Sequence, residues 1–163
     1  MDELAQKAMD QALRLLSFRA RSEREMADRL AKKGFAPDVA DRTVARLREL
    51  NLLDDGVLAR DIAESRRRGG RGDHRIRQEL RKRGLAPETI AGALDAVPAE
   101  DGAERAWAAL QKRAARMKGL DRDRAYRRLQ GFLIRQGFGI DDSRSALKRF
   151  FSIVPDDEER IDP

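Results

Sequence analysis

The sequence contains no cysteine and only one histidine, His74, among its 163 residues. Without cysteine the chain can form neither a disulfide framework nor a thiolate zinc site, and nothing indicates an oxidising compartment. A single histidine also lacks the second imidazole or thiol that it would need to share a metal ion or to activate a nucleophile. We therefore expect His74 to be a surface residue at the start of a helix, and we expect no cofactor.

Aromatic residues make up only 5% of the chain, and no run of 18 apolar residues occurs. The chain begins with Met1-Asp2-Glu3 and lacks the basic and apolar segments of a secretion signal, so we expect a cytoplasmic protein with no membrane partner. Charged residues reach 39%, and Ala, Leu, Arg and Glu dominate. This composition favours polar-faced helices over sheets and predicts an all-α protein.

An internal repeat is the strongest pattern in the sequence. The segment 30–37 returns about 50 residues later as 80–87, and a shorter copy follows at 133–138. In each copy a leucine is followed four residues later by a glycine that can end a helix in a left-handed conformation. We therefore predict three tandem three-helix modules, followed by an acidic tail: residues 1–51, 52–98 and 99–154, with the tail at 155–163.

Residue types that begin or end helices support this division. Those that we interpret as helix starts are Asp2, the Ser22–Glu25 capping box, Pro37, Asp54, Asp73 and Pro87. Gly69, Gly70 and Gly72 break the chain inside the second module, and Pro98 closes that module. In the third module, the apolar stripes that we expect to face the core are Ala103, Trp107, Leu110 and Ala114; Ala125, Leu129 and Phe132; and Ala146, Leu147, Phe150 and Phe151.

The net charge of +6 is unevenly distributed along the chain. Residues 1–63 carry 12 basic and 12 acidic groups, whereas residues 64–83 carry nine basic and three acidic groups. Residues 104–149 carry thirteen basic and five acidic groups, and segments 84–103 and 150–163 each sum to −4. A basic middle and C-terminal region beside a neutral first third indicates that part of the molecule contacts a polyanion.

Basic side chains gather on one face of several predicted helices. Arg77, Arg81 and Lys82 lie opposite the apolar face of their helix, and Arg105 and Lys112 share a narrow arc of another helix with a third cation, Arg116. Such neighbours repel each other by a few tenths of a kcal/mol per pair, so a phosphate-bearing partner is a plausible compensation. A solvated face is the alternative, because arginine is a good helix former. A third basic face contains Arg124, Arg127, Arg128 and Arg135.

The most concentrated charge is the run from Arg66 to Gly72, which contains Arg67, Arg68 and Arg71. Mobile arginines beside exposed backbone N–H groups can wrap a phosphate backbone, and a solvated linker is the alternative interpretation. The run is not a P-loop, because no Gly-Lys-Ser/Thr sequence follows it and no predicted strand precedes it.

Other candidate sites have simpler explanations. The pairs Asp54-Asp55 and Asp141-Asp142 each precede a predicted helix, where capping explains an aspartate without metal or acid-base chemistry. Trp107 and Tyr126 lie on or beside apolar stripes, which favours core packing over base stacking. A helix-turn-helix is disfavoured, because the helix expected between Pro87 and Pro98 contains no Arg or Lys to face phosphates.

The centre of the chain carries the pattern of a known family. Its residues are Leu53-Asp54-Asp55, Leu58-Ala59, Arg66, Gly70-Arg71-Gly72, Ile76, Glu79-Leu80 and Gly84-Leu85. In these residues and their spacing the chain resembles RecX, the regulator of the RecA recombinase in bacteria. The resemblance spans roughly residues 13–151, and it departs at Asp73 and Leu58, where many members have proline and phenylalanine.

The resemblance implies three tandem three-helix units in an elongated, curved molecule. It also implies that the protein acts without catalysis and docks along the helical groove of a RecA filament on single-stranded DNA, limiting the extension or activity of the filament. We expect a monomer. From charge alone we predict that the residues that contact the filament or its DNA are Arg66, Arg67, Arg68, Arg71, Arg77, Arg81, Lys82, Arg105, Lys112 and Arg116.

Two other classes of function stay open. A stand-alone helical protein that binds single-stranded DNA, duplex DNA or RNA would explain the charge, although the acidic helix between Pro87 and Pro98 disfavours it. An enzyme has only the aspartate pairs in its favour, and it would require divalent-metal binding that is abolished when Asp54→Asn and Asp55→Asn are combined.

Overall fold

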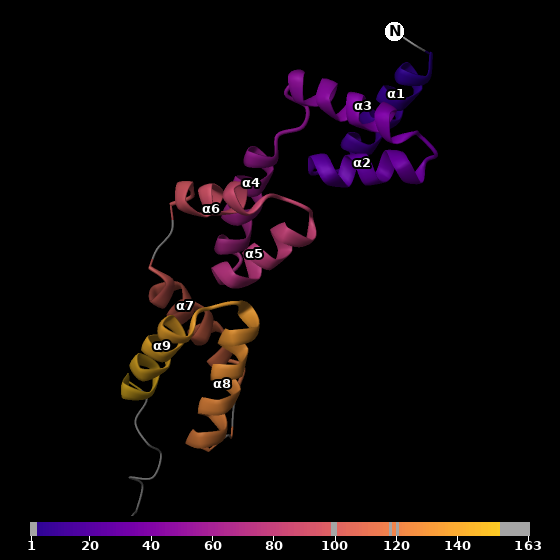
Figure 1. Cartoon of the computed structure of the whole chain (residues 1–163). Coiled ribbons are helices and arrows are strands. Elements are labelled where there is room, and N and C mark those ends of the chain that lie inside the picture. Colours follow the sequence, from indigo (N-terminus) through magenta and orange to yellow (C-terminus); the bar gives the residue numbers. More distant parts are fainter. Residues whose placement is uncertain (1–2, 99–100, 118, 120, 154–163) are drawn as a thin grey trace, which may run out of the picture. The chain divides into compact units, whose positions relative to one another are not determined.

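The computed structural model describes residues 3–98, 101–117, 119 and 121–153. These residues form helices and connecting turns with no strand, which confirms the predicted all-α fold (Figure 1). The predicted cap Asp2 and the predicted acidic tail lie outside the described residues. The helices are α1 Glu3–Phe18, α2 Glu23–Lys32, α3 Pro37–Glu49, α4 Asp55–Arg68, α5 Asp73–Lys82, α6 Pro87–Ala96, α7 Gly102–Ala114, α8 Arg122–Gln136 and α9 Ile140–Ile153.

The chain divides into two compact units. The first unit comprises Met1–Ala63 and Gln78–Val97, and the second comprises Glu64–Arg77 and Pro98–Pro163. Both α4 and α5 therefore contribute their two halves to different units. A unit is a body of packed helices, whereas a module is a stretch of the sequence repeat, and the module boundaries stay a prediction.

One core cluster of the first unit lies where α1, α2 and α3 pack against one another. Its buried side chains come from all three helices and from the segment after α3, and they are Ala12, Met26, Leu30, Ala40, Leu47 and Leu53. The N-terminus of α2 carries the predicted capping box, because Ser22 Oγ accepts from Glu25 N and the Glu25 carboxylate accepts from Ser22 N. Pro37 begins α3 as predicted.

The core of the second unit lies between α7, α8 and α9. Its buried members are Ala106, Ala109, Leu110, Leu129, Leu133, Phe138, Ala146 and Leu147. The stripe predicted for α7 is partly wrong, because Ala106 and Ala109 are buried while Ala103 and Ala114 are only half-buried. The reason is that α7 packs against both α8 and α9 and buries a wider face than one stripe.

The repeated leucine-glycine phrase ends three helices in the same way. Gly34, Gly84 and Gly137 have φ values of 90°, 82° and 91°, the left-handed conformation that the sequence predicts. In each copy the glycine N–H donates to the carbonyl three residues earlier, and the next N–H donates to the leucine carbonyl that begins the phrase. These two bonds form a Schellman motif, which satisfies carbonyls that the helix itself leaves unpaired.

Helix ends of successive repeats are bonded to one another. Ser22 precedes α2, and its Oγ donates to the carbonyl of Arg83 at the end of α5. Gly72 holds the same repeat position before α5, and its N–H donates over 2.8 Å to the carbonyl of Gln136 at the end of α8. We call this contact the N-to-C joint. It brings a helix start to a helix end, where the partial charges of the two helix dipoles are opposite.

Each joint contains a carboxylate held between two arginines. In the first unit Glu25 accepts from Arg83 at 2.8 and 3.1 Å and from Arg19 at 3.1 Å. Burial alone would raise the pKa of Glu25, but the hydrogen bonds from Arg83, Arg19 and the Ser22 amide lower it to about 2. In the second unit Asp73 takes this role with Arg67 and Arg105.

The close approach at the second joint predicts a strong effect of one methyl group. An added Cβ at Gly72 would lie 2.2 Å from the carbonyl carbon of Gly137, so the two backbones would have to separate. We expect Gly72→Ala to lower the free energy of unfolding by about 1–3 kcal/mol in urea denaturation. Gly92→Ala is the control, because a Cβ there meets nothing within 4 Å and the change should stabilise α6 by about 0.5–1 kcal/mol. Equal stability of the two variants would contradict the joint.

Candidate nucleic-acid interface

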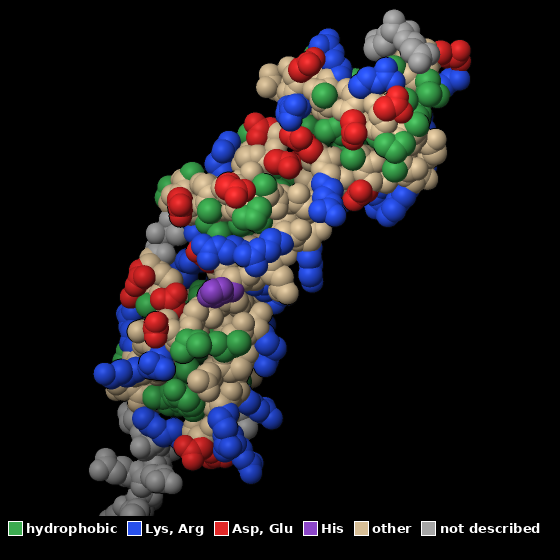
Figure 2. All heavy atoms as spheres, viewed as in Figure 1, with side chains coloured by type: hydrophobic (Ala, Val, Ile, Leu, Met, Phe, Trp, Pro, Cys, Tyr) green, Lys and Arg blue, Asp and Glu red, His purple; other side chains and the backbone are tan. Residues whose placement is uncertain are grey.

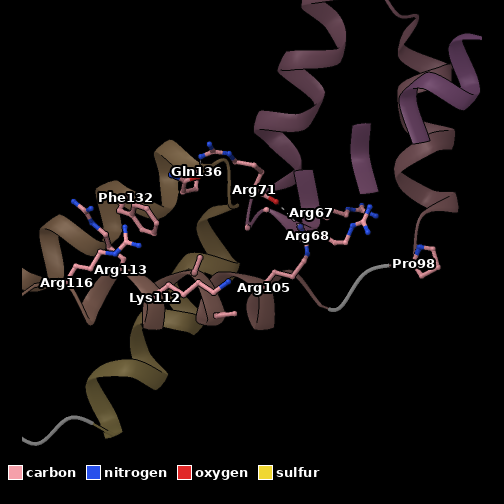
Figure 3. Close-up of a pocket in the computed structure, with 14 residues that line it drawn as sticks. Arg67, Arg68, Arg71, Pro98, Arg105, Lys112, Arg113, Arg116, Phe132 and Gln136 are labelled. Atoms are coloured by element: carbon pink, nitrogen blue, oxygen red, sulfur yellow. Dashed lines mark hydrogen bonds between the residues drawn. The ribbon is translucent and has the colours of Figure 1, made fainter. Parts of the chain in front are cut away.

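The second unit contains a pocket of about 540 Å³ between the last turn of α4, the turn that follows it, α7 and α8 (Figure 3). Seven of its fourteen lining residues are cationic, and none of these described residues is acidic. The cations are Arg67, Arg68, Arg71, Arg105, Lys112, Arg113 and Arg116, and the other lining residues are Gly69, Gly70, Pro98, Ala108, Ala109, Phe132 and Gln136. The pocket is therefore suited to an anionic ligand.

The wall that α7 contributes follows from helical spacing. Arg105 and Lys112 are seven residues apart and lie on one face, as the sequence predicts, and Arg116 follows just after the helix ends. Ala108 and Ala109 lie between the cations, and their small side chains leave the space of the pocket open. The predicted basic arc thus lines a concave surface.

Asp73 holds two of the pocket arginines in place through hydrogen bonds. Its carboxylate accepts from Arg67 in a bidentate pair at 2.9 and 3.0 Å and from Arg105 at 3.1 Å. The side chains of Arg67 and Arg105 are only 9% and 13% exposed, so both guanidinium groups are held rigidly. Burial alone would raise the pKa of Asp73, but the hydrogen bond from Arg67 and the charge of Arg105 lower it. The predicted role of Asp73 was to cap α5, yet it is the first residue of that helix and binds arginines.

The turn after α4 is closed by backbone hydrogen bonds, contrary to the prediction that it exposes backbone N–H groups. Gly70 has a φ of 76° and ends α4 with the same Schellman bonds as the repeat glycines. The amides of Gly69, Gly70, Arg71 and Gly72 all donate to backbone carbonyls, so they cannot serve as the predicted phosphate donors. Only side chains of this turn remain to bind an anion. The Arg71 side chain donates to the Gln136 amide oxygen across the pocket.

An aromatic ring lies beside the cations on the α8 side. Phe132 is half-buried, packs against the core of the second unit and also lines the pocket. The guanidinium carbon of Arg113 lies 5.6 Å from the centre of its ring, within the range of a cation–π interaction. Figure 3 shows Phe132, Arg113 and Arg116 together at one end of the pocket.

Six of the ten predicted contact residues line this pocket, and the other four do not. The six are Arg67, Arg68, Arg71, Arg105, Lys112 and Arg116. Arg66 is exposed on the last turn of α4, and Arg77 is half-buried on α5 within the second unit. Arg81 and Lys82 are exposed and belong to the first unit. For all ten residues, contact with a partner stays a prediction.

Sequence reasoning missed Arg113, Phe132 and Gln136. Arg113 lies next to Lys112, one residue outside the arc that the helical projection selected. Phe132 was assigned to the core face of α8, and it serves both the core and the pocket because it is half-buried. Gln136 precedes a repeat glycine, as Arg83 does in the copy before it, and this shared position was the signal that could have identified it.

His74 and Asp54 lie where the sequence predicts them, whereas Tyr126 is exposed and Asp141 and Asp142 lie inside the first turn of α9 rather than before it. His74 is exposed in the first turn of α5, and no group of Asp, Glu, His or Cys in the described part of the chain could hold a metal ion. Asp54 caps α4 by accepting from Val57 N at 2.9 Å. Arginines also gather over α8, in the lower part of Figure 2, where Arg124, Arg127, Arg128 and Arg135 are exposed. None of the helices in the described ranges has the length and apolar character that crossing a membrane requires.

Comparison with protein-family models identifies the fold pattern. Residues 8–47 match the model described as RecX, first three-helix domain, and residues 54–94 match RecX, second three-helix domain. Residues 99–147 match RecX, third three-helix domain. The chain belongs to the RecX family. The three matches confirm the resemblance to RecX that the central motif indicated, and they extend it from the second module to the other two.

Individual members of the RecX family match over nearly the whole chain. The regulatory protein RecX of Halorhodospira halophila is 40% identical over 157 residues, which cover 93% of this chain and 90% of the relative. That of Chlorobium limicola is 32% identical over 158 residues and covers 96% and 98%. A crystal structure of RecX from Lactobacillus salivarius shares the fold with a TM-score of 0.76 at 20% identity, covering 94% of this chain and 100% of that one.

The Asp73 cluster predicts a pH-dependent contribution to stability. Because its pKa is lowered in the folded state, the contribution is present above the usual value of 3.8 and is lost as pH falls below it. Asp73→Asn should lower the free energy of unfolding at pH 7 by about 1–3 kcal/mol and flatten its dependence on pH below about 4. Urea denaturation at pH 7 and pH 3 tests this. Asp95→Asn, at an exposed position on α6, is the control, and identical curves for both variants would contradict the cluster.

Proposed function

We propose that this RecX-family chain regulates a RecA recombinase, mainly as an inhibitor. It would dock in the groove of the RecA filament on single-stranded DNA and limit the extension, ATPase and strand exchange of that filament. This activity belongs to DNA repair, recombination and the SOS response in the cytoplasm. The chain would act as a monomer and without catalysis, by binding alone.

The observation that carries this proposal is the cationic pocket of the second unit in a chain of this family. A recombinase filament exposes both acidic protein surface and nucleic-acid phosphate, and seven cations around one cavity complement either. Residues 1–63 have no net charge, which supports an arrangement in which the basic segments that follow them contact the polyanion. The relatives support the regulatory part of the proposal, because their name is regulatory protein RecX.

We assign filament or DNA contact to the ten cations predicted from charge, and we add Arg113. Arg68, Lys112 and Arg116 are exposed on the pocket wall and can reach a partner directly. Arg67 and Arg105 are bound to Asp73, so they would contact a partner as fixed charges of the wall rather than as mobile side chains.

The decisive experiment measures the DNA-dependent ATPase of RecA on single-stranded DNA in excess, with this protein well below the concentration of RecA. We expect suppression at such low ratios, because one filament-docked regulator acts on many RecA subunits. Competition for DNA would not lower the ATPase rate, because the DNA is in excess. The combined variant Arg68→Gln, Lys112→Gln and Arg116→Gln should need about tenfold more protein for the same suppression.

A matched triple variant of exposed cations in the first unit controls for net charge. Arg14→Gln, Lys32→Gln and Lys33→Gln remove the same three charges from outside the pocket and should leave the suppression unchanged. Equal loss in both triple variants would remove the assignment of the pocket, and absence of any suppression with the cognate recombinase would refute the proposed function.

A stand-alone nucleic-acid-binding protein is the second candidate, and the absence of carboxylates from the described lining residues favours it. Salt dependence separates the two. Binding through about six phosphate contacts should lose about three decades of affinity between 50 and 200 mM salt, whereas shape-matched docking on a protein filament should lose less. We expect the steep loss for naked DNA and a shallower one for the RecA filament, measured by fluorescence anisotropy. The same slope for both would favour the stand-alone function.

A further inference from the structure

The pocket presents groups that a phosphate site does not need. Phe132 and Gln136 lie one turn apart on α8, and both line the cavity. Arg113 places its guanidinium over the Phe132 ring at 5.6 Å. Aromatic rings and arginine planes stack on nucleobases, and amides read base edges through hydrogen bonds. The end of the pocket around Phe132 is therefore chemically suited to a base, beside cations that suit its phosphates.

The dimensions of the pocket point in the same direction. Its volume of about 540 Å³ falls within the roughly 300–1,000 Å³ of sites for small organic ligands, which is more than a phosphate group requires. A duplex keeps its bases stacked and paired, so they cannot enter a concave site, whereas a single strand can splay a base out. A cavity of this size can therefore accommodate an unpaired nucleotide.

The cations of the pocket differ in what they can bind. Asp73 holds Arg67 and Arg105, and their charge is partly neutralised. Lys112 and Arg116 are exposed and line the pocket, and Figure 3 shows Arg116 at the end that contains Phe132 and Lys112 between Arg116 and Arg105. Phosphates beside a base at Phe132 would therefore meet these two exposed cations.

We propose that this pocket seats one unpaired nucleotide of a DNA single strand. The base packs against the Phe132–Arg113 pair, the Gln136 amide nitrogen donates to the base edge, and the flanking phosphates bind Lys112 and Arg116. The proposal deepens the proposed function and rests on it in one respect, that the pocket meets DNA. It adds that the site recognises the base as well as the charge.

The test uses the full chain with RecA absent, and it separates base from phosphate. Fluorescence anisotropy measures affinity for a labelled strand of about 20 thymidines, for the same strand with abasic sites, and for a duplex of equal length. The wild type should bind the ordinary strand about tenfold more tightly than the abasic strand. Phe132→Leu should lose that tenfold preference while its salt slope stays unchanged, because no phosphate contact is removed.

Two further variants keep the test interpretable. Phe151→Leu removes an aromatic ring from the same unit that does not line the pocket, and it should bind both strands like the wild type. Phe132→Tyr retains the ring and should restore the preference for the ordinary strand. Circular dichroism at the assay temperature shows whether each variant is folded.

Three results would overturn the nucleotide site. Wild-type protein could bind ordinary and abasic strands equally, which would show that phosphate contacts alone account for the binding. Phe132→Leu could weaken binding to both strands by the same factor, which would show a packing effect. ATP at micromolar concentration could displace the strand, which would reassign the pocket to a free nucleotide. None of these results affects the suppression of RecA ATPase, so the proposed function and the nucleotide site fail separately.

Discussion

The N-to-C joint, in which the start of one helix bonds to the end of another, is the contact on which both compact units depend. The modules are short, and their cores consist largely of alanine and leucine with few aromatic rings, so apolar burial per module is modest. At the joints, Ser22 and Gly72 bond to the ends of α5 and α8. These bonds satisfy helix-end groups and align opposite ends of helix dipoles, which gives the packing a defined register.

The second joint also positions the pocket. Asp73 begins α5 beside Gly72, and it binds Arg67 from α4 and Arg105 from α7. The same carboxylate thus connects three helices and sets the direction of two cationic side chains in the pocket wall. Stability and site electrostatics are coupled at this residue, because neutralising Asp73 would loosen the wall while raising the positive charge of the pocket.

Features with partners close in sequence could be predicted, and features with distant partners could not. The Ser22–Glu25 capping box, Pro37 at a helix start and the left-handed Gly84 depend on residues within five positions, so the sequence alone indicated them. The bonds from Asp73 to Arg105 and from Gly72 to Gln136 join residues 32 and 64 positions apart, and no local pattern encodes them. Only the cationic residues of the pocket could be predicted from the sequence. Its aromatic residue, Phe132, also packs against the core and was assigned to the core alone.

The two joints differ at one repeat position, and the difference explains why the pocket occurs in the second unit. Glu25 and Arg75 both lie three residues after the joint residue, so a carboxylate in the first joint is replaced by a cation in the second. Glu25 neutralises Arg19 and Arg83, whereas Arg75 donates to the Arg135 carbonyl and neutralises nothing. Asp73 pairs with Arg67 and Arg105 in the second joint, and Arg75 adds a further positive charge there. A local excess of positive charge favours the binding of an external anion.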